Sequence, residues 1–111
     1  DFFGDDPYLP WVSERRDFLR QCHITALLRT AELNEAKGRL KKAIACCQRV
    51  IQADPVHEES YRKLMQLFAR CGMDSAAIKT YENCRKALRE ELDAEPGEIT
   101  TAIYRKLLKS V

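Results

Sequence analysis

The sequence repeats itself at an interval of thirty-four residues. Two segments carry the same residue types in the same order: Gly38, Ala43 and Ile44, and then Gly72, Ala77 and Ile78. This interval accommodates two helices and the turn between them. A small residue such as Ala43 lets two antiparallel helices approach closely, and a glycine ends the preceding helix in a left-handed conformation. The repeat therefore predicts a module of stacked helix pairs, and such modules bind other molecules rather than catalyse reactions.

Further positions in both copies resemble a tetratricopeptide repeat, which has large apolar, small, Gly, Ala and often Pro residues at fixed places. The matching residues are Leu27, Ala31, Gly38, Ala43 and Pro55 in the first copy, and Tyr61, Leu64, Phe68, Gly72, Ala77 and Tyr81 in the second. We therefore expect an all-α fold, a tetratricopeptide-like right-handed superhelix of antiparallel helix pairs. Repeat one is expected over residues 24–57 and repeat two over residues 58–95.

Helix breakers divide the chain into its expected elements. Residues 1–9 are interpreted as an irregular lead-in loop whose aromatic pair tucks into the domain. Helices are expected over residues 10–38, 40–53, 57–71, 74–92 and 98–110. The last of these carries Ile99, Ile103 and Leu107 at helical spacing, and it is expected to cap the exposed side of repeat two.

Composition favours one helical domain over residues 1–111. The chain is 45% hydrophobic, which supports a single core, and strong helix formers outnumber β-branched residues. Nineteen basic and seventeen acidic side chains leave a net charge of +2. This surplus is too small to neutralise many phosphates, so direct binding of nucleic acid by this segment is disfavoured.

The cysteines carry no recognisable metal or redox motif. The chain has five, without a C-x-x-C pair: Cys22, Cys46, Cys47, Cys71 and Cys84. We interpret them as free thiols that act as small apolar core residues in a reducing cytosol, with a regulatory disulfide as the alternative. No apolar run is long enough to span a membrane and no signal segment begins the chain, so a cytoplasmic location without a membrane partner is expected.

No catalytic, cofactor-binding or metal-binding residue is assigned. His23 and His57 are the only histidines, and neither has carboxylates or thiols at metal-ligand spacing. The sequence has no Gly-rich phosphate loop and no nucleophile elbow. We therefore expect a protein that is not an enzyme and that needs no cofactor.

Three segments carry motifs that are not general features of helical repeats. Residues 4–19, with the sequence GDDPYLPWVSERRDFL, combine a loop with a Pro-Trp helix start. Residues 54–65 begin the second repeat, and residues 88–96 end in the element Leu-x-x-Glu-Pro. Together these segments resemble the bacterial transcriptional activator domain of antibiotic-regulatory-protein-type regulators. The resemblance spans essentially the whole chain. Departures occur at Thr30, at Asn34 and at Gly97-Glu98, where the family commonly has an aliphatic residue, an aromatic residue and Ser or Ser-Pro.

This resemblance implies the regulatory and self-association part of a bacterial transcription regulator. In that family the domain normally follows a winged-helix DNA-binding domain, which is not in this sequence. The implied partners are the regulator's own DNA-binding domain, a second copy and the transcription machinery, with DNA contacted only through the missing domain. The alternative is a tetratricopeptide adaptor that binds a partner peptide and has no role in transcription. A winged-helix segment upstream in the parent chain would favour the transcription regulator over the adaptor.

A partner-binding surface is expected on the concave side of the helix pairs. Counting the repeat from Ile24 and Glu58 places the following charged and polar residues there: Glu32, Glu35, Glu59, Arg62, Gln66 and Arg70. Arg62 and Arg70 are eight residues apart, about two helical turns, so both guanidinium groups can face one acidic segment of a partner. The alternative interpretation is an ordinary solvated helix face.

Overall fold

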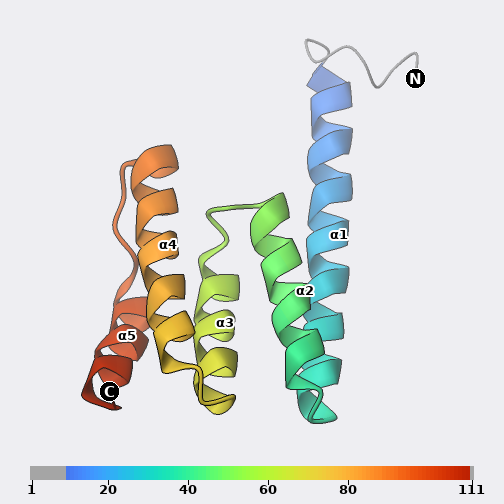
Figure 1. Cartoon of the computed structure of the whole chain (residues 1–111). Coiled ribbons are helices and arrows are strands. Elements are labelled where there is room, and N and C mark those ends of the chain that lie inside the picture. The colour runs from blue at the N-terminus through green and yellow to red at the C-terminus, as the bar shows by residue number, and fades with distance from the viewer. Residues whose placement is uncertain (1–9, 111) are drawn as a thin grey trace.

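The structure is a computed structural model that describes residues 10–110, and it is built from helices packed side by side (Figure 1). The elements are α1 (Pro10–Ala36), α2 (Leu40–Ala53), α3 (Glu58–Arg70), α4 (Asp74–Leu92) and α5 (Glu98–Ser110). No strand occurs within residues 10–110. The predicted all-α, tetratricopeptide-like fold is confirmed. The expected lead-in loop, with Phe2 and Phe3, lies outside the described residues.

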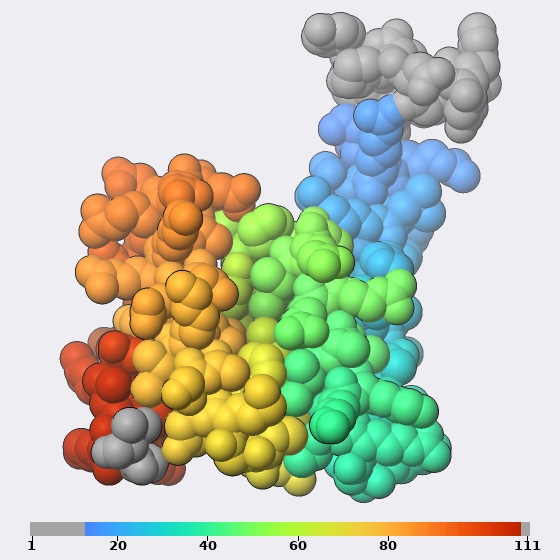
Figure 2. All heavy atoms as spheres, in the orientation of Figure 1, coloured from blue at the N-terminus to red at the C-terminus, as the bar shows by residue number. Residues whose placement is uncertain are grey.

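Helices that are neighbours in sequence are neighbours in space. α1 packs on α2, α2 on α3 and α3 on α4, and α5 lies against both α3 and α4. α1 is about twice as long as α2, with 27 residues against 14. The N-terminal half of α1 therefore stands clear of the other helices (Figure 2). Within the described range, no helix is both long and apolar enough to cross a bilayer.

The two repeated glycines end α1 and α3 in the same way. Gly38 has φ 77° and Gly72 has φ 74°, which is the left-handed region that glycine adopts without strain. Equivalent backbone hydrogen bonds close the two turns: Arg39 N–H to Asn34 O at 2.7 Å, and Met73 N–H to Phe68 O at 2.8 Å. Each bond satisfies a carbonyl at the helix end. The thirty-four-residue repeat is therefore a repeat of turn geometry as well as of residue type.

The turn between α2 and α3 is built without glycine. Asp54 ends α2, and its side-chain Oδ1 accepts a hydrogen bond from the Val56 N–H at 3.3 Å. The buried Tyr61 donates its hydroxyl to the Pro55 carbonyl at 2.7 Å. Burial raises the pKa of Tyr61 to about 12, so this phenol stays protonated and able to donate. Pro55 thus ends the helix pair, as its missing N–H predicts.

Small residues are buried between the packed helices. Ala43 and Ala77 are both 0% exposed. Ala43 belongs to a buried cluster with residues of α1 and α3 (Ala31, Leu64 and Leu67), and Ala77 to one with residues of α3 and α5 (Met65 and Leu107). Two neighbouring cysteines of α2, Cys46 and Cys47, are also buried, because α2 lies between α1 and α3. Burial raises the pKa of the Cys47 thiol to about 11.

The expectation that all five cysteines are core residues is wrong for two of them. Cys84 is buried, and burial raises the pKa of its thiol to about 12. Cys22 is exposed because it lies on the outer face of α1, away from α2. Cys71 is exposed because it follows the last residue of α3, at the turn.

The packing face of α5 is rotated from the expected one. Thr100 and Leu107 are buried, and Tyr104 stacks on Tyr81 of α4 with ring centroids 3.9 Å apart and an angle of 9° between the rings. Ile99, which was expected on this face, is 67% exposed, and Leu108 is 47% exposed. Thr100, next to Ile99, is buried instead, because its hydroxyl has the polar partners Glu58 and Arg62 on α3. Hydrophobic periodicity does not reveal such a contact.

Gly72→Ala is expected to lower the free energy of unfolding by about 1–2 kcal/mol, because a Cβ strains a left-handed backbone. A Cβ at this position meets no atom within 4 Å, so the cost is conformational rather than steric. Urea denaturation followed by circular dichroism measures it. Gly38→Ala has the same geometry and is expected to give a similar loss. An unchanged midpoint for both variants would contradict the role given to these turns.

Candidate functional site

The six predicted partner-binding residues fall into two groups in the structure. Glu35 of α1 and Arg70 of α3 meet in one ion cluster. Glu59, Arg62 and Gln66 line a groove between α3 and α5. Glu32 is exposed and forms no part of either group. The structure therefore brings five of the six residues into two adjoining parts of one α3-centred surface.

A carboxylate from α1 joins two cations of α3 in the first group. Glu35 Oε1 lies 2.8 Å from Lys63 Nζ, and Glu35 Oε2 lies 2.9 Å from Arg70 Nη1. The hydrogen bond from Lys63 holds the pKa of Glu35 below its ordinary value, against the opposing effect of burial. The same hydrogen bond raises the pKa of Lys63. With two cations and one carboxylate, this cluster keeps a net positive charge.

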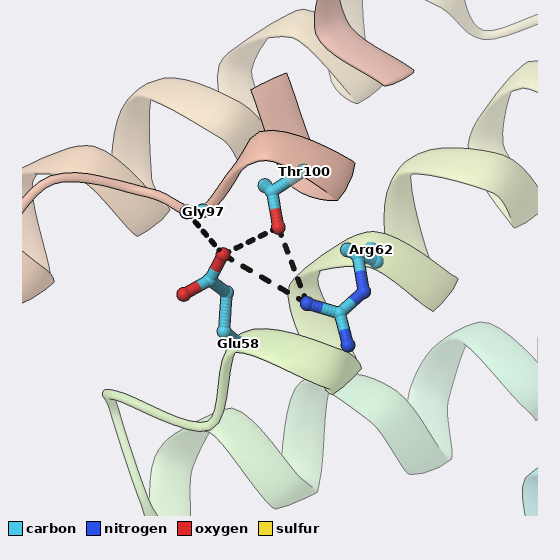
Figure 3. Close-up of polar contacts among 4 residues, drawn as sticks. All are labelled: Glu58, Arg62, Gly97 and Thr100. Atoms are coloured by element: carbon cyan, nitrogen blue, oxygen red, sulfur yellow. Dashed lines mark hydrogen bonds and ion pairs between the residues drawn. The ribbon is translucent and has the colours of Figure 1, made fainter. Parts of the chain in front are cut away.

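The second group contains a polar contact that fixes the start of α5 (Figure 3). Glu58 Oε2 accepts hydrogen bonds from the Gly97 N–H at 2.7 Å and from the Thr100 hydroxyl at 2.5 Å. Arg62 Nη1 lies 3.8 Å from the same carboxylate oxygen and donates to Thr100 Oγ1 at 3.3 Å. A carboxylate at the N-terminus of α5 also interacts favourably with the helix dipole. Arg62 is therefore held in place by contacts within the chain.

Gly97 leaves room for this approach. A Cβ at position 97 would lie 3.2 Å from Glu58 Oε2, closer than an ordinary van der Waals contact. The departure from the family pattern at Gly97-Glu98 thus has a physical account, since the glycine leaves room for the carboxylate.

The groove between α3 and α5 has a volume of about 230 Å³. Residues of α3 and α5 line it: Glu59, Arg62, Lys63, Gln66, Ile99 and Ile103. One wall is polar and charged, and the other is formed by two isoleucines. Sequence reasoning missed Lys63, although its spacing from Glu59 and Arg70 places it on the same side of α3. It also missed the isoleucine wall, because the face that α5 turns to α3 depends on contacts with distant residues, among them Glu58.

The histidines do not form a site. His57 shares a 2.8 Å hydrogen bond with the buried Ser60 at the start of α3. Among residues 10–110, no group of three or more His, Cys, Asp or Glu side chains is arranged to hold a metal ion. The groove and its adjoining ion cluster combine charge on one side with apolar contact on the other, an arrangement suited to recognition of a partner.

Comparison with known proteins gives two findings. The family described as the bacterial transcriptional activator domain matches residues 1–108. Two proteins named transcriptional regulatory protein MoaR1 are 32% identical to the chain over 81 residues, one from Mycobacterium bovis (strain BCG / Pasteur 1173P2) and one from Mycobacterium tuberculosis (strain ATCC 25618 / H37Rv). The match covers 73% of this chain and 26% of each relative. The chain thus spans about a quarter of the length of these relatives.

Glu35→Gln is expected to lower the free energy of unfolding at pH 7 by about 0.5–1 kcal/mol, the range for a partly exposed ion pair. The pKa of Glu35 in the folded protein lies below its ordinary value of 4.5. Its contribution is therefore complete above that pH and is lost as the pH falls through the folded pKa. Denaturation at a series of pH values measures the difference, and Glu14→Gln, at an exposed position of the same helix, is the matched control. A difference that persists unchanged to low pH would contradict the ion-pair origin.

Glu58→Ala is expected to destabilise α5 by about 1–3 kcal/mol, because the buried Thr100 hydroxyl loses its acceptor. Hydrogen exchange measures the effect helix by helix. Amides of α5 are expected to exchange faster, while those in the α1–α2 pair keep their rates. Glu90→Ala, at an exposed position of α4, is the control. Equal acceleration throughout the protein would show that Glu58 supports the whole fold and not this contact.

Proposed function

The chain belongs to the bacterial transcriptional activator domain family, and we propose that it is the regulatory, protein-binding part of a bacterial transcription regulator. In this proposal it acts in the cytoplasm by contact with proteins and catalyses no reaction. Its partners are a winged-helix DNA-binding domain in the same regulator, a second copy of the domain and the transcription machinery. The family match along almost the whole chain is the observation that carries the proposal.

The α3–α5 groove with its adjoining ion cluster is the proposed contact surface. Arg62 and Arg70 are eight residues apart on α3, about 12 Å along the helix axis. Arg70 shares the Glu35 carboxylate with Lys63, so the ion cluster itself keeps a positive charge that a partner carboxylate can meet. In the groove beside it, Arg62 is balanced by Glu58 and Glu59. Ile99 and Ile103 offer an apolar wall beside these cations. The partner segment is therefore one that presents a carboxylate close to an apolar side chain.

A peptide-binding adaptor with no role in transcription is the second candidate. The groove suits it equally well, because a helical-repeat fold by itself does not determine function. The mycobacterial relatives are named transcriptional regulatory proteins, which favours the regulator. The small net charge of the chain supports the view that DNA is contacted through another domain.

A reporter experiment separates the two candidates. The 111-residue chain is fused to a DNA-binding domain whose operator lies upstream of a bacterial promoter. Transcription is expected to change several-fold relative to the DNA-binding domain alone. The double change Arg62→Ala and Arg70→Ala is expected to remove most of this effect, because it removes two cations from the proposed contact surface.

Lys79→Ala with Lys109→Ala is the matched control, since these exposed cations lie away from the groove. Circular dichroism checks that every variant remains folded, which matters for Arg62 because of its contact with Thr100. A folded fusion that occupies the operator and leaves transcription unchanged contradicts the regulator and favours the adaptor. An equal loss in the control variant contradicts the assignment to the groove.

A further inference from the structure

α1 carries a second apolar stripe on the face that points away from α2. Its residues are Phe18, Leu19, Cys22, Ala26 and Leu33, which we call the outer stripe. All five are exposed, with Phe18 at 65%, Leu19 at 53% and Leu33 at 62%. At about 100° per residue, the five positions fall within one sector of roughly 100° on the helix. An exposed apolar patch of this kind marks an interaction site more often than a scatter of single residues does.

The outer stripe is not an extension of the core. The core face of α1 is the opposite one, where Ile24 and Leu27 are buried against Val50 of α2. One part of α1 projects beyond α2 (Figure 1). There the positions on the core side are polar, and Asp17 and Arg20 form an ion pair at 3.3 Å. A longer α2 would therefore find no apolar surface there. The only apolar face of this projecting part, within the described side chains, is the outer one.

The surface is shaped for a helix. Cys22 and Ala26 are small, lie one turn apart and sit at the middle of the outer stripe, with the larger Phe18 and Leu33 towards its ends. A shallow groove of about 400 Å³ runs over this part of α1, lined by Phe18, Gln21, Cys22, Thr25, Ala26 and Arg29. Small residues between large ones allow the ridge of a second helix to approach closely. The other end of the stack differs, because α5 covers α4 there.

The charged residues beside the outer stripe are mainly basic, which favours an acidic partner helix. Arg15 and Arg29 lie within the sector of the outer stripe, fourteen residues apart, which is about 21 Å along the axis. Lys37 lies near the C-terminal end of the outer stripe, and Glu14 and Glu32 border it on one side. Residues 10–53 as a whole contain nine basic and four acidic side chains, whereas residues 54–110 contain ten of each. The α1–α2 pair is thus the positive end of the molecule.

We propose that the outer stripe docks an amphipathic α-helix of a partner protein with acidic side chains about four turns apart. Its apolar face packs on Phe18, Cys22 and Leu33, and its carboxylates meet Arg15 and Arg29. This inference is independent of the α3–α5 groove, because it concerns another helix and another set of residues.

A second copy of the chain fits the outer stripe poorly. Antiparallel packing of two α1 helices about Cys22 sets Arg15 of one copy against Arg29 of the other, since both are seven residues from Cys22. Parallel packing in register sets each arginine against its equivalent. Either arrangement places like charges together across an apolar contact, which is unfavourable. An acidic helix removes this repulsion and replaces it with charge-assisted pairs.

A display library of helical peptides tests the proposal on the 111-residue chain. The peptides share one apolar stripe, and their flanking positions vary among Glu, Lys and Gln. Selected peptides are expected to carry Glu at positions about fourteen residues apart. Phe18→Glu is expected to weaken a selected peptide about tenfold or more, the effect of losing an aromatic anchor. Leu92→Glu, an exposed apolar residue of α4, is the matched control and is expected to leave binding unchanged.

The double reversal Arg15→Glu and Arg29→Glu is expected to shift the selected peptides from Glu to Lys at the facing positions. Circular dichroism of each variant excludes a loss of folding as the cause. Peptides without a charge preference, or peptides that bind the Phe18→Glu variant as well as the wild type, overturn the proposal. Concentration-dependent dimerisation in sedimentation velocity that Phe18→Glu abolishes also overturns it, because a second copy then occupies the stripe.

Discussion

The burial of Ala43 and Ala77 between neighbouring helices is the packing on which the rest of the structure depends. Each methyl group is fully buried, so a larger side chain at either place would push the neighbouring helices apart. Because α1, α2 and α3 pack at this separation, the Glu35 carboxylate of α1 reaches both Lys63 and Arg70 on α3. The ion cluster on this surface is thus a consequence of the apolar packing beneath it.

Local features of the fold could be predicted from the sequence because they are encoded within a few residues. Gly38, Gly72 and Pro55 each restrict their own turn, and the helices between them end where these residues require. The packing face of α5 could not be predicted in this way. Thr100 is buried by virtue of its bonds to Glu58 and Arg62, about forty residues earlier, and no periodicity within α5 signals that contact.

The candidate site was predictable only in part for the same reason. Arg62, Gln66 and Arg70 follow from helical spacing along α3. The surroundings of these residues depend on which helices pack against α3. The pairing of Arg70 with Glu35 of α1 and the isoleucine wall of α5 are therefore seen only in the structure. The family resemblance predicted the functional class, which helical periodicity could not. It rests on the order of particular residues over the whole chain and not on any single helix.

The apolar surface at the two ends of the helix stack is treated differently. A stack of helix pairs exposes apolar surface at each end, and this surface needs a cover or a polar outer face. At one end α5 provides the cover, fixed by Glu58 and by the stacked rings of Tyr81 and Tyr104. At the other end the outer face of α1 keeps Phe18, Leu19 and Leu33 exposed beside arginines. Arginines within the outer stripe disfavour its pairing with an identical helix, and the proposed acidic partner helix removes that repulsion.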